Sequence, residues 1–295
     1  MSMSDVLHFK ANDAAVCGLS TYTIIPIRGI ALNRAFLRQK LLSFRTNAIH
    51  GLGIRESDIP SVEQLVKRAI SSASQSSYDN AQLVIIASPG EAKWGMFGDL
   101  GTPHVLMNVI DNTRCPNTIS LGTVAVTDEY KVSHRKSMEL GWNRLVAHRV
   151  QKDGYDDALL YSTDYCVLQG SHNNVFWIKG DQVFTPEIIP GLVFDGISRC
   201  IVQTICENLN VDFIEKKAVV EELQQADAIF MGEFKPVDRV DGVFITSKNN
   251  ALFSALNNHY IEAYAYPSET TGIGSTMFGE QSLPSMVKCV EGLAE

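Results

Sequence analysis

The distribution of apolar residues over the first 127 positions predicts a mixture of strands and helices. Short runs of β-branched and aliphatic residues predict strands, whereas apolar residues that recur every three or four positions predict two amphipathic helices. The predicted strands cover residues 6–9, 21–29, 81–87, 102–110 and 117–126, and the predicted helices cover 32–51 and 59–72. Pro26 favours a sheet edge or a bulge for its strand, because proline has no N–H to donate. We therefore expect residues 1–127 to form a small α+β domain.

A second, larger domain is predicted over residues 135–265, where the same two periodicities recur. The polar segment 128–134 is the expected connector between the two domains. The predicted strands cover 157–161, 166–168, 174–178, 182–185, 210–214, 218–220, 227–231 and 243–245, and the predicted helices cover 137–153, 196–209 and 249–264. Lys179-Gly180-Asp181 predicts a hairpin turn. Residues 266–295 are expected to form a tail, and the predicted fold class is α/β (α+β) with two domains.

The composition argues against several classes of function. The chain has 295 residues, of which 45% are hydrophobic, and a formal net charge of −8. This acidic balance gives no basic footprint for nucleic acid, and no apolar run approaches the roughly 20 residues of a membrane span. The six cysteines form no CxxC pair, so no metal site is expected. The first residues show no basic-then-apolar export signal, and we therefore expect a cytoplasmic protein.

The segment from Gly154 to Arg199 carries the most specific pattern in the sequence. It contains, in this order, Asp157-Ala158-Leu159-Leu160, Gly170-Ser171, Asn174-Val175-Phe176 and Gly196-Ile197-Ser198-Arg199. Their order and spacing resemble those of the fold-type-IV pyridoxal-phosphate (PLP) enzymes, a family that includes branched-chain aminotransferases, D-amino-acid aminotransferases and aminodeoxychorismate lyase. The resemblance implies a two-domain fold-type-IV aminotransferase-like fold with PLP in the cleft between the domains. It also implies a small-molecule amino substrate and a homodimer.

The resemblance further implies a catalytic lysine. Members of the family hold PLP as a Schiff base on a lysine, and Lys136 stands at the family's distance before Ala158 without a gap. A lysine suits this role because burial and nearby cations lower its pKa and free the amine to attack. The alternative is that Lys136 is a surface lysine at the start of a helix, like Lys131 and Lys152 on either side of it.

A phosphate site is expected where the helix predicted at 196–209 begins. The first turn of a helix leaves backbone N–H groups without intrahelical partners, and these groups bind anions. The resemblance implies that Gly196, Ile197 and Ser198 hold the phosphate through N–H groups and the Ser198 hydroxyl. It also implies that Asn174 and Gly232 contact the cofactor. The alternative is an ordinary serine near a helix N-cap.

Two cofactor anchors of the family are replaced in this chain. Ser43 stands in place of the arginine that binds the phosphate, a loss expected to weaken binding about ten- to a hundredfold. Lys40 and Arg45 are the candidates to replace that arginine from neighbouring helix positions. Gln169 stands in place of the glutamate that faces the pyridine nitrogen, and its neutral side chain cannot hold a proton there by charge. A carbanion step is then expected to be about tenfold slower.

A third departure lies in the segment 231–237, which is shorter than the corresponding loop of the family. Glu233 in this segment would bring a negative charge close to the expected phosphate. Two functions of different classes therefore remain open. One is a PLP-dependent transaminase or lyase that acts on a small amino compound through Lys136, and this is our leading hypothesis. The other is a diverged member that has lost PLP and works as a cofactor-free enzyme or a ligand-binding protein.

Overall fold

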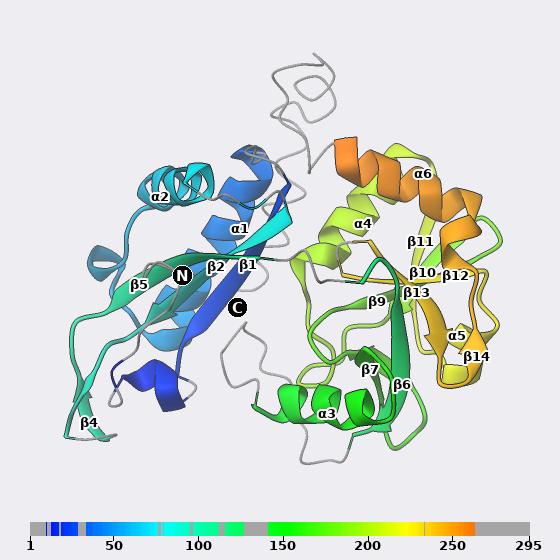
Figure 1. The fold of residues 1–295 in the computed structure, drawn as a ribbon, viewed down its shortest axis with the longest axis horizontal. Coiled ribbons are helices and arrows are strands. Elements are labelled where there is room, and N and C mark those ends of the chain that lie inside the picture. The colour runs from blue at the N-terminus through cyan, green and yellow to red at the C-terminus, as the bar shows by residue number, and fades with distance from the viewer. Residues whose placement is uncertain are drawn as a thin grey trace. The chain divides into compact units, whose positions relative to one another are not determined.

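The computed structural model describes residues 10, 13–17, 19–28, 34–75, 78, 80–94, 97–111, 116–126, 141–232 and 234–262. The chain divides into two compact units, drawn in Figure 1. Unit 1 contains residues 1–115, 135–140 and 262–295, and unit 2 contains residues 116–134 and 141–261. Several predicted features lie outside the described residues: Lys136, Glu233, the strand at 6–9, the connector at 128–134 and the tail at 266–295.

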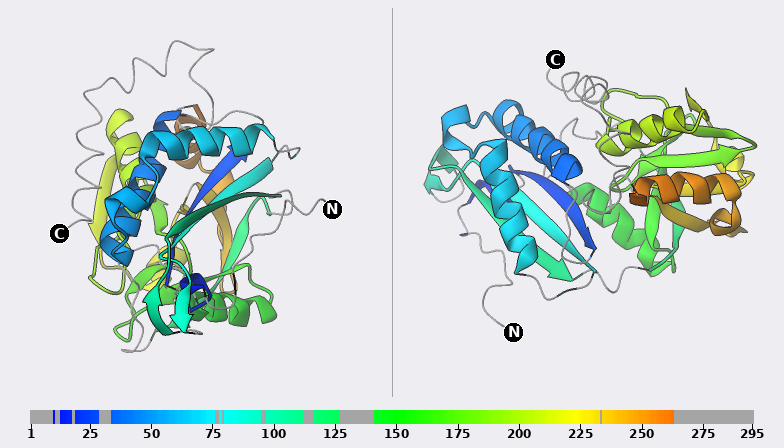
Figure 2. Two further views of the ribbon diagram at one scale, coloured as in Figure 1. Left: turned by 90° about the vertical axis from the view of Figure 1, so that its left-hand side faces the viewer. Right: turned by 90° about the horizontal axis from the view of Figure 1, so that it is seen from above.

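Unit 1 is built on a three-stranded antiparallel sheet with two helices packed on it (Figure 2). The sheet has the order β1 (Thr21–Arg28), β2 (Asn80–Ser88) and β5 (His104–Asp111). The helices are α1 (Arg34–Thr46) and α2 (Val62–Ser74). The shorter elements are η1 (Ala14–Cys17), η2 (Asn47–Gly51), η3 (Glu56–Asp58) and the hairpin of β3 (Ala92–Trp94) and β4 (Phe97–Leu100).

The core of unit 1 forms where the apolar side of α1 meets the sheet. Leu37, Leu41 and Phe44 repeat every three or four residues along α1, and all three are buried. They share one hydrophobic cluster with Ile25 and Ile27 of β1. This spacing explains why the segment folds as an amphipathic helix, and it confirms the helix predicted there. β1 is an edge strand, as its proline predicts.

Unit 2 is built on a nine-stranded mixed sheet. The strands follow the order β11-β10-β9-β12-β13-β6-β7-β8, and β14 pairs with β13. Their bounds are β6 (Ile119–Ala125), β7 (Asp157–Tyr161), β8 (Val167–Gly170), β9 (Val175–Lys179), β10 (Gln182–Pro186), β11 (Asp212–Lys216), β12 (Ala228–Met231), β13 (Lys235–Val240) and β14 (Val243–Phe244). β9 and β10 pair as a hairpin across Gly180, whose φ of 57° suits glycine, and this confirms the predicted turn.

The described residues of unit 2 also form four helices, of which α4 and α6 lie side by side in Figures 1 and 2. They are α3 (Gly141–Lys152), α4 (Ile197–Asn208), α5 (Val220–Gln224) and α6 (Ala251–Tyr260), with the short η4 (Ser247–Asn249) before α6. Ala158 and Leu160 of β7 pack with Val146 and Val150 of α3, whereas Leu159 joins a different cluster on the opposite face of the sheet. Burial on both faces explains the continuous apolar run of β7. Within the described residues, no helix is long and apolar enough to cross a membrane.

The sheet of unit 2 differs from the prediction in three places. The strand predicted at 218–220 is wrong, because Val219 makes only an isolated bridge with Cys166 and Val220 begins α5. The predicted division at residue 127 puts β6 in the first domain, but β6 pairs with β7 and β13, so the two units divide between residues 115 and 116. β13 is not predicted, because its sequence contains a proline and three charged residues. It forms because Val237 and Val240 are buried and because a polar residue finds a partner: Asp238 accepts a hydrogen bond from Thr118 Oγ1 at 2.6 Å.

Candidate functional site

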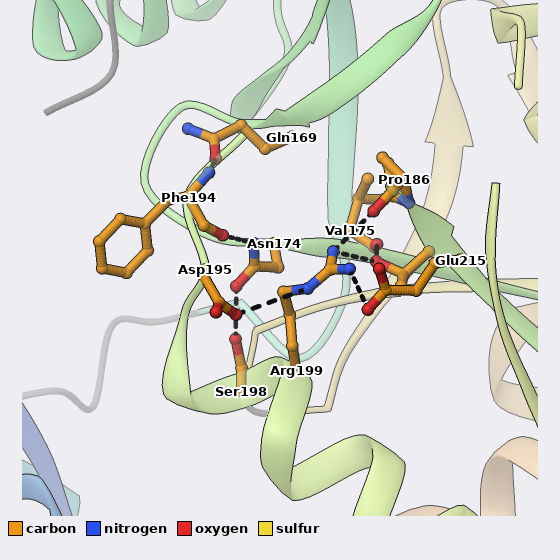
Figure 3. A network of polar contacts seen from close by, with 10 residues as sticks. Gln169, Asn174, Val175, Pro186, Phe194, Asp195, Ser198, Arg199 and Glu215 are labelled. Atoms are coloured by element: carbon orange, nitrogen blue, oxygen red, sulfur yellow. Dashed lines mark hydrogen bonds and ion pairs between the residues drawn. The ribbon is translucent and has the colours of Figure 1, made fainter. Parts of the chain in front are cut away.

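Most of the residues predicted to contact a cofactor come together at the N-terminal end of α4. The turn between β8 and β9, the segment that leads from β10 into α4, and the end of β12 meet there. We call the residues joined by hydrogen bonds and ion pairs at this place the α4 network: Gln169, Asn174, Phe194, Asp195, Gly196, Ser198, Arg199 and Glu215. Figure 3 labels all of them except Gly196. All of them belong to unit 2, so their mutual geometry is described within one compact body.

The main chain of Phe194 is held from two sides within the α4 network. Gln169 Oε1 accepts a hydrogen bond from Phe194 N–H at 2.8 Å, and Asn174 Nδ2 donates one to Phe194 O at 2.7 Å. Gln169 and Asn174 are only 3% and 4% exposed, so these bonds are shielded from water and correspondingly strong. The two side chains therefore fix the path of the chain as it enters α4.

The first turn of α4 presents free backbone donors. Gly196 is the N-cap, and no side chain caps the helix. Within the described part of the chain, no acceptor lies on the N–H groups of Ile197 and Ser198. Ser198 Oγ donates to Asn174 Oδ1 at 2.9 Å, and a Cβ on Gly196 would collide with that same oxygen. Two unpaired donors at the positive end of a helix are suited to bind an anion.

Arg199 anchors the start of α4 to the sheet. It donates to Thr185 Oγ1 at 3.1 Å and to Pro186 O at 2.7 Å. Its Nη2 lies 2.6 Å from Glu215 Oε1, as an ion pair rather than a well-aligned hydrogen bond, and its Nε lies 3.9 Å from Asp195 Oδ1. Arg199 is 3% exposed, so its charge interacts with these partners and hardly at all with water. The sequence motif contains Arg199 but assigns it no role, because its burial and its partners are visible only in the structure.

Asp195 is the acidic group next to the free N–H donors. Burial raises the pKa of its carboxyl above the ordinary range, and the nearby Arg199 opposes this rise. A carboxyl that takes up a proton readily can become neutral when a second anion approaches, which lessens their repulsion. The position of Asp195 is therefore compatible with an anion at the first turn of α4.

Gly232 adjoins the α4 network at the end of β12. Its N–H donates to Asn174 O at 3.0 Å. It has a φ of 48°, and an added Cβ would lie 2.8 Å from Asn173 Oδ1, so both the backbone conformation and the available space favour glycine. Gly232 thus belongs beside Asn174, although Glu233, which follows it, lies outside the described residues.

A second polar cluster lies beside the network, and we call it the β7 cluster: Asp157, Ser171 and His172. Ser171 Oγ contacts both Asp157 Oδ1 and His172 Nδ1, and Ser171 itself is fully buried. Burial raises the pKa of Asp157, and the hydrogen bond from Ser171 opposes this rise. Burial lowers the pKa of His172, and Asp157 opposes that shift. The sequence identifies Asp157 and Ser171 only as motif positions and does not reveal this contact.

The remaining predicted residues that the structure describes, Ser43, Lys40 and Arg45, belong to unit 1. Ser43 lies in α1 of unit 1 and is 7% exposed. Arg45 pairs with Glu56 at 3.0 Å and donates to Pro60 O at 3.2 Å, so its charge is engaged within unit 1. Lys40 is also buried there, with Nζ 5.1 Å from the centre of a phenylalanine ring. Among the described residues, no group of three or more His, Cys, Asp or Glu side chains could hold a metal ion.

Comparison with known proteins identifies the family to which the chain belongs and the solved structures whose fold it resembles. The sequence pattern of the family described as amino-transferase class IV matches residues 47–233. D-alanine aminotransferase of Bacillus licheniformis is 30% identical over 116 residues, which is 38% of this chain and 40% of that protein. The chain therefore matches less than half the length of this curated relative.

Solved structures resemble the chain over most of its length. A putative 4-amino-4-deoxychorismate lyase from Legionella pneumophila gives a TM-score of 0.74 at 18% identity, covering 88% of this chain and 96% of that chain. An aminotransferase from Brucella abortus, solved bound to PLP, gives a TM-score of 0.73 at 18% identity, covering 88% and 94%. At such identities the likeness concerns the fold alone, and it confirms the predicted α/β fold of the fold-type-IV kind.

Proposed function

Because this chain belongs to the class IV amino-transferase family, we propose that it is a PLP-dependent transaminase or lyase that acts on a small amino compound. Lys136 would form the Schiff base with the cofactor. PLP, when bound, supplies an aromatic ring that withdraws electrons from the amino carbon of the substrate. The observation that carries the proposal is the first turn of α4, where the N–H groups of Ile197 and Ser198 have no acceptor among the described residues.

The residues of the α4 network fit a phosphate group. The two free N–H groups point out of a helix of 12 residues, which is long enough to carry a useful dipole. The Ser198 hydroxyl already donates to Asn174, so the main chain rather than this hydroxyl supplies the hydrogen-bond donors. Gly196 lets Asn174 approach closely, and Asn174 in turn holds Phe194 and Ser198 in place. In this proposal Gly232 supports the same asparagine through the hydrogen bond from its N–H to Asn174 O.

The replaced anchors predict weak rather than absent cofactor binding. Ser43 supplies no charge, and Arg45 is engaged with Glu56 and Pro60. The loss of one charge-assisted hydrogen bond should weaken binding about ten- to a hundredfold relative to a member that keeps its arginine.

We also propose that the protein forms a homodimer, as the family resemblance implies. Light scattering at several protein concentrations tests this.

The deciding experiment is to add PLP to the purified protein, record the visible spectrum, reduce with borohydride and map the labelled peptide by mass. We expect a visible absorption band and a label on Lys136. Lys136→Ala should lose both, whereas Lys152→Ala, which removes an exposed lysine at the end of α3, should keep both. A panel of amino acids and aminodeoxychorismate then separates transaminase from lyase.

The result that would contradict the proposal is the absence of both band and label at millimolar PLP. The chain would then be a member of the family that no longer uses PLP, and it would work as a cofactor-free enzyme or a ligand-binding protein. The replacements at Ser43 and Gln169 are the features that such a result would explain.

A further inference from the structure

Gln169 has an orientation that follows from its neighbours. Its Oε1 accepts a hydrogen bond from Phe194 N–H at 2.8 Å. A main-chain N–H can only donate, so the amide oxygen of Gln169 must face Phe194 and the amide nitrogen must face the other way. Figure 3 shows this nitrogen turned away from the α4 network. Among the described residues, no acceptor lies on it.

The reverse orientation of the amide is disfavoured. It would set the NH2 group of Gln169 against Phe194 N–H and leave that donor without an acceptor. Gln169 is 3% exposed, so little water is available to make up the loss. Phe194 cannot easily turn away either, because Asn174 holds its carbonyl group at 2.7 Å. The side of the Gln169 amide that faces away from Phe194 therefore carries hydrogen-bond donors only.

We propose that Gln169 donates a hydrogen bond to the ring nitrogen of PLP, and that this chain therefore binds PLP with the ring nitrogen unprotonated. The inference rests on the proposed function and on the family resemblance, which implies that Gln169 faces the pyridine nitrogen of PLP. A protonated ring nitrogen carries its own N–H. This N–H and the NH2 group of Gln169 are both hydrogen-bond donors, so neither would find an acceptor in the other. A glutamate at this position could accept from Phe194 with one oxygen and from a protonated ring nitrogen with the other. The amide of Gln169 thus stabilises PLP with an unprotonated ring nitrogen, whereas a carboxylate at this position would stabilise PLP with a protonated ring nitrogen.

The consequence is a weaker electron sink than a protonated ring provides. Reactions that build up much negative charge on the amino carbon should be slow in this protein. Gln169→Glu should accelerate them, by about tenfold where proton removal from that carbon limits the rate. The replacement of glutamate by glutamine then restricts the reactions that the protein catalyses, rather than only weakening cofactor binding.

The test is the nitrogen resonance of 15N-labelled PLP bound to the full chain, which reports protonation of the ring without any turnover. We expect the wild-type protein to show a neutral-pyridine shift that stays constant between about pH 6 and pH 9, because the Gln169 donor disfavours protonation. Gln169→Glu should move the resonance to the pyridinium range. Gln75→Glu, the same change at an exposed residue after α2, should leave it at the wild-type position.

A second measurement uses the PLP analogue in which a C–H group replaces the ring nitrogen. The wild-type protein should bind it about tenfold more weakly than PLP, because one hydrogen bond is lost. A pyridinium resonance in the wild-type protein, or equal affinity for the two compounds, would overturn this inference and leave the proposed function intact. The absence of bound PLP would overturn both. If Gln169→Glu does not fold, the wild-type resonance and the analogue still decide the matter.

Discussion

The α4 network and the β7 cluster lie close together in the sequence and hold their geometry by different means. The network rests mainly on amide and main-chain groups that do not titrate, such as the pair that Gln169 and Asn174 make with Phe194. The β7 cluster joins Asp157 and His172 through one serine, and burial moves the pKa values of these two groups in opposite directions. We infer that the path of the main chain at Phe194, which Gln169 and Asn174 fix, is insensitive to pH, whereas the neighbouring cluster is not.

Arg199→Met should have the largest effect, because it removes the one buried charge of the α4 network. Thr185 and Pro186 lose a charged donor, and Glu215 loses its partner. Glu215 is 44% exposed, so water compensates part of this loss, and we expect unfolding by urea to become easier by about 2–3 kcal/mol.

The control for this change is Arg239→Met, at a partly exposed arginine that donates to Gly154 O and lies over the ring of Tyr155. It should cost about 1 kcal/mol or less. Equal losses in the two variants would contradict the view that Arg199 anchors α4.

Gly196→Ala tests the close approach in the α4 network. The added Cβ would collide with Asn174 Oδ1, so the asparagine must shift away from Ser198 and Phe194. We expect a loss of about 1–2 kcal/mol in the free energy of unfolding, since overpacking is costly but a side chain can give way. PLP affinity, measured by titration, should fall about tenfold or more. Gly242→Ala, where no atom lies within 4 Å of the new Cβ, should change neither quantity.

Local signals in the sequence predict much of this fold. The hairpin at Gly180 and the helix α1 follow from a turn triplet and from residues spaced by three and four, and both depend on neighbours along the chain. β13 and the place of β6 depend on partners far away in the sequence, which periodicity cannot reveal. From the sequence, the charged residues of β13 are expected in a solvent-exposed loop. In the structure Asp238 finds a hydrogen-bond partner in Thr118, which is 120 residues away.

The same division applies to the candidate site. The motif positions predict that Asn174, Gly196 and Ser198 act together, and the structure brings them into contact. The sequence does not predict which atom of Gln169 is engaged, because that depends on the main chain of Phe194, which carries no sequence signal. The sequence also does not predict the partners that Arg199 finds on β10 and β11, because those strands lie outside α4 along the chain.

Asp157→Asn should have a smaller effect that appears only as a dependence on pH. The folded-state pKa of Asp157 lies above its ordinary value of 3.8, so the folded protein binds more protons than the unfolded one in the interval between them. The free energy of unfolding that Asp157 contributes therefore falls as the pH rises through this interval. Asparagine can still accept from Ser171 and from Ala158 N–H. Urea titrations at several pH values should show this fall in the wild-type protein and its absence in the variant.

His172→Asn should have the smallest effect and the opposite sign. The folded-state pKa of His172 lies below its ordinary value of 6.5, because burial disfavours the charged ring more than Asp157 favours it. Its contribution to stability is therefore complete above about pH 6.5 and is lost as the pH falls through the folded-state pKa. Asparagine places an amide nitrogen near the position of Nδ1 and can keep the contact with Ser171 Oγ, so the change removes the titration while retaining the hydrogen bond.

Below pH 6.5, the free energy of unfolding of the His172→Asn variant should therefore depend less on pH than that of the wild-type protein. The nitrogen resonance of bound PLP should be the same in both proteins. A change in that resonance would mean that titration in the β7 cluster alters the α4 network. The view that the two regions respond independently to pH would then be wrong.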